Sequence, residues 1–201
     1  MNENIEKCMK WNVQVNAMMG FVMSFTSPVI HVYMIQSIEE DFYKIVMFLT
    51  ELISVFIFFY IDRRDEKNQP VNLKKMRLHF LPVVICGCLC FIIANIFGMI
   101  DVRVRFLILA SVEAFFSFLW GTIMRDIFNQ FIHATDLTAF TNKVGKIDRI
   151  GRLLGGLLII VVNLGVEAAL VIQMFGYVSM GVVDYKIYKV LRYKENAYGK
   201  E

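Results

Sequence analysis

The sequence lacks the short motifs that identify many enzyme active sites. It has no Gly-x-Ser-x-Gly nucleophile elbow, no His-Glu-x-x-His pair and no Gly-x-x-x-x-Gly-Lys phosphate loop. Its three histidines, His31, His79 and His133, are isolated from one another. We therefore expect no enzyme activity, no metal centre and no cofactor.

Long polar segments are also scarce, since only 19% of the residues are charged and 57% are hydrophobic. A helix rises about 1.5 Å per residue, so roughly 20 apolar residues cross a bilayer. The sequence predicts an all-α fold, a single-domain bundle (1–201) of six transmembrane helices. The expected spans are residues 13–36, 42–61, 78–100, 104–124, 150–164 and 168–185.

Four cysteines are present, and three of them alternate along the third span. Successive helical residues are about 100° apart, so Cys88 points away from Cys86 and Cys90. These three cannot converge on one metal while the segment is helical. We expect them to pack as small apolar residues, whereas a soft-metal site needs an unwound segment.

The basic residues predict the orientation of the chain. Of the 21 lysines and arginines, Lys44, Arg103 and Arg105 fall in outer segments and the other 18 fall on the side of the termini. The positive-inside rule then places both termini in the cytoplasm, in a multi-pass protein of the cell membrane. Because the basic residues are spread along one membrane face, we expect contact with anionic headgroups and no nucleic-acid partner.

Small and polar residues form a stripe along the first span. On a helix they fall within an arc of roughly 120°. The stripe consists of Asn12, Asn16, Gly20, Ser24, Ser27 and His31. Such a stripe either lines a polar cavity or lets a neighbouring helix approach closely. Both interpretations remain open, and Pro28 is expected to kink the helix.

Other spans carry similar features. Gln173, Tyr177 and Asp184 share one side of the sixth span, and Asn95 lies beside a small-residue face of the third. The glycines at 151 and 155 form a Gly-x-x-x-Gly pair, which is typical of close helix contact.

Two carboxylates fall near the middle of apolar spans. They are Glu51 in the second span and Glu113 in the fourth. A charged group at mid-depth costs about 2.5–3.5 kcal/mol on insertion scales, so it normally faces protein or water and often marks an ion or proton path. The alternative is a structural hydrogen bond to a neighbouring helix.

The layout resembles one half of a major facilitator superfamily transporter. That family has six spans per half, a basic loop after the second span and an Arg- and Gly-rich entry to the fifth. The loop of the family carries a Gly-x-x-x-Asp-Arg-x-Gly-Arg pattern, which Asp62-Arg63 matches and which Phe58 departs from at the first glycine. The start of the fifth span, with Gly151, Arg152 and Gly155, is similar to the family's fifth helix.

The resemblance implies a half-size transporter that works as a parallel homodimer in the lipid bilayer. It places the first and fourth helices at a central cavity and Asp62, Arg63 and Arg152 at a cytoplasmic gate. We expect transport of a small or amphipathic solute, with Glu51 or Glu113 as the candidate for proton coupling. The expected path residues are Asn16, Ser24, Ser27, His31, Glu51, Asn95, Glu113 and Gln173. The alternative function is a non-transporting accessory, immunity or complex-subunit protein of the membrane.

Overall fold

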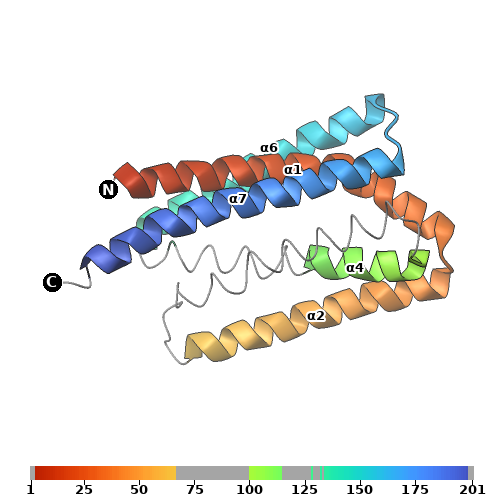
Figure 1. The fold of residues 1–201 in the computed structure, drawn as a ribbon, viewed down its shortest axis with the longest axis horizontal. Coiled ribbons are helices and arrows are strands. Elements are labelled where there is room, and N and C mark those ends of the chain that lie inside the picture. Colours follow the sequence, from red (N-terminus) through yellow and green to blue (C-terminus); the bar gives the residue numbers. More distant parts are fainter. Residues whose placement is uncertain (1–2, 67–99, 115–127, 129–131, 133, 199–201) are drawn as a thin grey trace.

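The computed structural model describes residues 3–66, 100–114, 128, 132 and 134–198. This part of the chain is all-α and contains five helices. They are α1 (Glu3–Ser37), α2 (Glu40–Glu66), α4 (Val102–Ala114), α6 (Ala134–Val161) and α7 (Val166–Tyr198). Both termini lie at the same end of the molecule (Figure 1).

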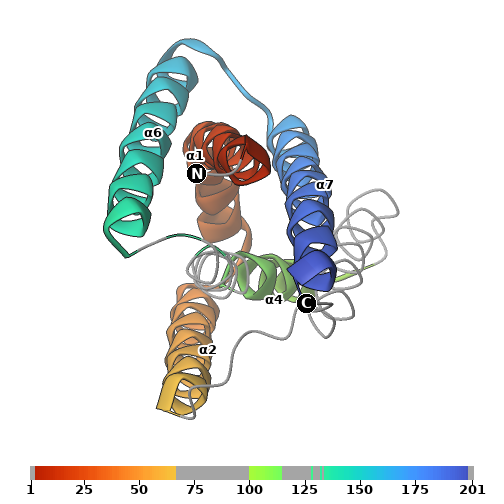
Figure 2. The same cartoon turned by 90° about the vertical axis from the view of Figure 1, so that its left-hand side faces the viewer.

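Helix α1 is the centre of the bundle. It packs between α6 on one side and α7 on the other (Figure 2). Helix α6 runs parallel to α1, because Gly151 lies against Ala17 and Gly155 lies one turn further along, against Phe21. Helix α7 runs antiparallel to α1 (Figure 1). Helix α1 continues through Pro28, and its last turns bend toward the start of α2.

The contact between α1 and α6 brings the two backbones together. A Cβ atom added to Gly151 or Gly155 would overlap the carbonyl oxygens of Ala17 and Phe21, so neither position has room for a side chain. This confirms the close helix contact that the Gly-x-x-x-Gly pair predicts.

Helices α2 and α4 form a second layer, which joins the bundle near the C-terminal end of α1. Their contact is made by side chains. The rings of Tyr43 and Phe106 stack with centroids 5.6 Å apart, and Val46 is buried beside them. At the outer end, Arg103 Nη2 donates to Glu39 Oε1 at 2.8 Å.

The helices agree with the expected spans in part. Helices α1, α2 and α7 contain the predicted spans 13–36, 42–61 and 168–185. The described helix α4 covers 104–114 of the fourth span. The third span lies outside the described residues except for Ile100, which is not helical.

Helix α6 differs from the expected fifth span, 150–164, at both ends. Helix α6 begins at Ala134, sixteen residues earlier, and ends at Val161. The early start has a physical reason, because Leu137, Phe140 and Val144 recur at helical spacing and pack against the core formed by α1 and α7. The polar residues between them face outward, so this segment is an amphipathic helix rather than a loop.

Large apolar side chains cover the outer faces of the helices. On α6 the change is abrupt: the turns before Arg149 expose polar and charged residues, and the turns after it expose Ile150, Leu153, Leu157 and Ile160. In the described part of the chain, the segments Glu3–Ser37 and Val166–Leu191 are each long and apolar enough to cross a membrane.

Candidate functional site

The polar stripe of α1 is directed largely into the protein. Asn12 is buried, and the side-chain amide of Asn16 donates to the Asn12 carbonyl oxygen at 2.8 Å and to its Oδ1 at 3.2 Å. A Cβ atom at Gly20 would lie 2.6 Å from both the carbonyl oxygen and Oδ1 of Asp148. The stripe therefore satisfies part of its polarity within α1 and packs its glycine against α6.

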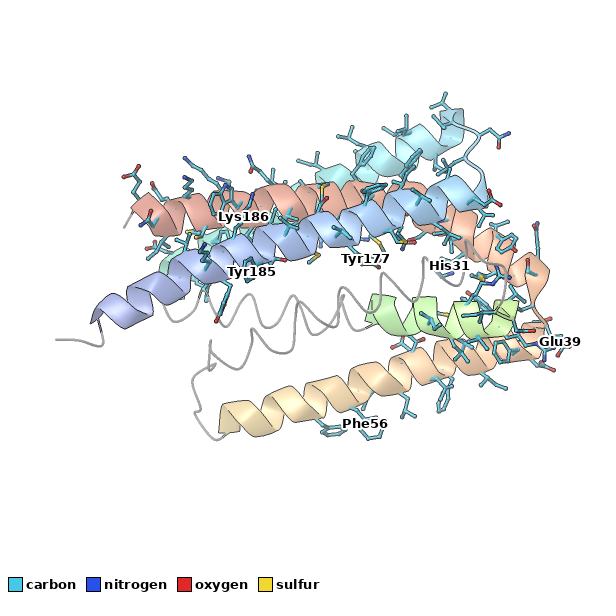
Figure 3. All side chains as sticks on the ribbon, viewed as in Figure 1. His31, Glu39, Phe56, Tyr177, Tyr185 and Lys186 are labelled. Atoms are coloured by element: carbon cyan, nitrogen blue, oxygen red, sulfur yellow. The ribbon has the colours of Figure 1, made fainter. Side chains whose placement is uncertain are left out.

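The resemblance to a half-transporter places the stripe of α1 at a central cavity. Instead, Gly20 contacts Asp148 of the same chain, and Ser24 Oγ lies 3.4 Å from the position of a Cβ at Gly156. The small residues of α1 thus serve close helix packing at these two positions. Ser27 and His31 are half-buried further along the helix, where His31 lies toward the end of the bundle opposite the termini (Figure 3).

Helix α7 places a buried polar face against α1. Gln173 is 1% exposed, and its Nε2 donates to Met23 Sδ at 3.4 Å. The Tyr177 hydroxyl reaches the same sulfur at 3.6 Å. A thioether is a weak acceptor, so these two hydrogen bonds to Met23 are weak ones.

Asp184 and Tyr188 extend this face toward the termini. Both are buried, and the Tyr188 hydroxyl makes no hydrogen bond within the described residues. Gly176 lies opposite Met19 and Val22. Because α7 is antiparallel to α1, Asp184, two turns beyond Gly176, falls at the level of Asn12 and Asn16. The α1–α7 contact thus gathers polar groups at two levels.

Glu51 lies on the outer surface of the bundle. Its side chain is exposed on α2. Phe48, Leu52 and Val55, one residue or one helical turn away, are exposed as well. Figure 3 shows Phe56 of the same helix pointing away from the other elements. The expected mid-span carboxylate is therefore present in α2, and its side chain is exposed rather than enclosed within the bundle.

Of the remaining predicted residues, only Arg152 has a described side chain. Its Nε pairs with Asp148 Oδ2 at 2.8 Å on its own helix. Asp62 and Arg63 lie in the last turns of α2, which packs on α4. Their side chains, the side chain of Glu113 and the whole of Asn95 lie outside the described residues.

Sequence reasoning gave no role to Met23 or Asp148. A methionine in an apolar helix carries no sequence signal that it will accept hydrogen bonds. The signal for Asp148 was its spacing of four from Arg152, which favours an ion pair on one helix face. Within the described ranges, no three His, Cys, Asp or Glu side chains gather as metal ligands, and Cys8 is buried in the core.

Comparison with known proteins gives no family for this arrangement. No family model, curated protein or solved structure matches the chain. The functional argument therefore depends on the chemistry of the described residues.

Proposed function

We propose that the chain is a multi-pass protein of the cell membrane with both termini in the cytoplasm. The outward apolar faces of α2, α6 and α7 support this, since they are too extensive for a surface in water. The basic residues Lys186 and Lys189 of α7 and Lys143 and Lys146 of α6 lie near the end that holds the termini, as the positive-inside rule requires.

Within the membrane, we propose that the protein works as a non-transporting accessory subunit that docks through α2. The observation that carries this proposal is the exposed Glu51 in the apolar outer face of α2. Lipid offers no hydrogen bond to a carboxyl group at mid-depth, so a second protein surface is the environment that satisfies it. The packing of Gly20 and Ser24 against α6 favours this role over a cavity formed by the α1 stripe.

A half-size transporter of the major facilitator type is the second candidate. The buried polar residues Asn12, Gln173 and Asp184 favour it, because such groups in a membrane bundle often belong to substrate or ion pathways. In this candidate a homodimer encloses the path, with Glu51 facing its copy. The exposed α2 face then becomes the interface between two copies of this chain.

Photocrosslinking in native membranes tests the accessory role. A photoreactive amino acid replaces Phe48 or Val55 on α2, with Leu153 or Ile160 on α6 as matched outward positions that have no acidic neighbour on the outer face. We expect one discrete protein adduct from both α2 positions and lipid adducts alone from both α6 positions.

Each other result has a definite meaning. Lipid adducts alone from α2 would contradict the accessory role. An adduct with the mass of two copies would contradict it as well and would favour the homodimeric transporter.

A further inference from the structure

The geometry points to a specific chemistry for the surface that covers α2: a transmembrane helix of another protein, with a lysine or arginine at the depth of Glu51. This inference rests on the proposed accessory role and adds the identity of the contact. It depends on three observations, which are the depth of Glu51, the shape of its surroundings and the positions of this chain's own basic residues.

Glu51 lies at the middle of the apolar part of α2. It is eleven residues from the start of the helix at Glu40, which corresponds to about 16 Å. The hydrocarbon core is about 30 Å thick, so the carboxyl group is at mid-depth if the helix begins at the interface. Near either surface, Glu51 would reach water or headgroups, but at mid-depth it needs a protein group.

The surroundings of Glu51 fit one partner helix. Phe48, Leu52, Val55 and Phe59 are exposed at a spacing of three or four residues, which makes a continuous stripe along α2. Apolar side chains at this spacing accept another helix along their length. Glu51 lies at the edge of the stripe, where it can reach a side chain of that helix.

Among the residues that the structure describes, the basic side chains of α2, α4 and α6 closest to the apolar segments lie away from that depth. Lys44 Nζ is 2.6 Å from Glu40 Oε1 and Arg103 Nη2 is 2.8 Å from Glu39 Oε1, both at the outer end of α2 and α4. Arg105 Nε donates to the Ile100 carbonyl oxygen at the same end. Arg152 is held by Asp148 at the level of Asn16 and Gly20 of α1, toward the end that holds the termini.

The sequence gives the same answer for the whole chain, because no lysine or arginine lies in the middle of any of the six expected spans. A second copy would therefore bring another Glu51 and no cation. Charge complementarity selects a different protein, with a cation that neutralises the carboxylate away from water.

Binding of model helices to the full-length protein tests this inference. The protein carries a donor fluorophore at Ser37→Cys, with its native cysteines replaced, in phosphatidylcholine vesicles. The partners are leucine-rich helices with an acceptor fluorophore and a central lysine, leucine or glutamate. We expect the lysine helix to bind at least about tenfold more tightly than the leucine helix, as measured by energy transfer. Glu51→Gln should reduce its binding to the level of the leucine helix.

A relocated carboxylate provides the matched control. Glu51→Gln combined with Val55→Glu moves the acid by one turn along the same exposed face. It should prefer a helix whose lysine is displaced by one turn in the same direction. Circular dichroism and gel filtration establish that each variant is folded.

The outcomes separate the inference from the proposed function. Equal binding of the lysine helix by the wild type and Glu51→Gln overturns the cationic partner. So does preferential binding of the glutamate helix, or a wild-type dimer that Glu51→Gln dissociates. If either equal binding or preference for the glutamate helix is found, protein adducts at Phe48 in native membranes would still support the accessory role. Lipid adducts alone at Phe48 would contradict that role.

Discussion

The α1–α6 contact and the α2–α4 layer are held together by different kinds of groups. Helix α6 meets α1 backbone to backbone at Gly151 and Gly155, with no side chain between them. Helix α2 meets α4 through the rings of Tyr43 and Phe106 and leaves its outer face uncovered. In lipid, association depends on close packing more than on apolar area. The first contact therefore acts as a fixed scaffold, and the second layer presents a surface for other molecules.

This difference also affects the proposed function. A pathway between α1 and α6 would require the two backbones to separate, with the loss of every contact at the glycines. Docking on α2 requires no internal rearrangement, since the exposed face is already in place. The structure of the scaffold thus favours a binding role at the α2 layer over a moving part at α1.

The largest expected loss of stability comes from a substitution in the contact between α2 and α4. Phe106 is 2% exposed and its ring stacks on Tyr43. Phe106→Ala should lower the free energy of unfolding by about 3 kcal/mol. This value is at the lower end of the range for removing a buried phenylalanine side chain, because lipid rather than water surrounds the protein. The matched variant Phe48→Ala, at a position 65% exposed, should change it by less than about 0.5 kcal/mol.

Reversible unfolding in mixed micelles measures both variants. A similar loss of stability for both would show that the outer face of α2 is as tightly packed as the inner one. That result would contradict the description of α2 as a presenting surface.

A smaller effect is expected at the α1–α6 scaffold. Gly155→Ala places a methyl group against the Phe21 carbonyl oxygen, and both backbones must shift to accommodate it. Overpacking of this kind costs about 1–3 kcal/mol. Gly145→Ala is the control on the same helix, since nothing lies within 4 Å of its added Cβ.

The two alanines should act in opposite directions. At Gly145, alanine should leave stability unchanged or raise it by up to about 1 kcal/mol, because it favours the helix over the unfolded chain. Thermal unfolding of the two variants, side by side, makes the comparison. If Gly155→Ala is as stable as Gly145→Ala, the backbone contact is absent.

The sequence predicted this scaffold better than the layer beside it. The spacing of Gly151 and Gly155 predicts the close helix contact directly, because only glycine leaves room for two backbones to touch. The positions of α1 and α7 follow from their long apolar runs, although α1 begins ten residues before its expected span and α7 ends thirteen residues after it. The early start of α6 was missed because its polar residues suggested a loop, although Leu137, Phe140 and Val144 have helical periodicity.

The orientation of α2 could not be predicted in the same way. Its apolar residues occur all round the helix, and in a membrane both lipid and protein interior accept apolar side chains. A carboxylate at mid-span predicts a polar environment, yet it does not tell whether this lies inside the chain or in another protein. The sequence predicts Glu51 on an internal path, because sequence alone does not distinguish these two environments. Only the structure shows that Glu51 is exposed.

The smallest effect concerns the polar face between α1 and α7, which packs on the other side of α1 from the scaffold and has weak hydrogen bonds. Tyr177 is 4% exposed and its hydroxyl lies 3.6 Å from Met23 Sδ. Tyr177→Phe keeps the ring and removes this bond, so we expect a loss of about 0.5 kcal/mol, as for an average interhelical hydrogen bond in a membrane. Tyr185→Phe, at a position 39% exposed on the same helix, should have no measurable effect.

Unfolding by a steric trap resolves differences of this size. A loss above about 2 kcal/mol for Tyr177→Phe would mean that the hydroxyl supports a larger polar network with Gln173, and the α1–α7 contact would then be a built polar site rather than a packing contact.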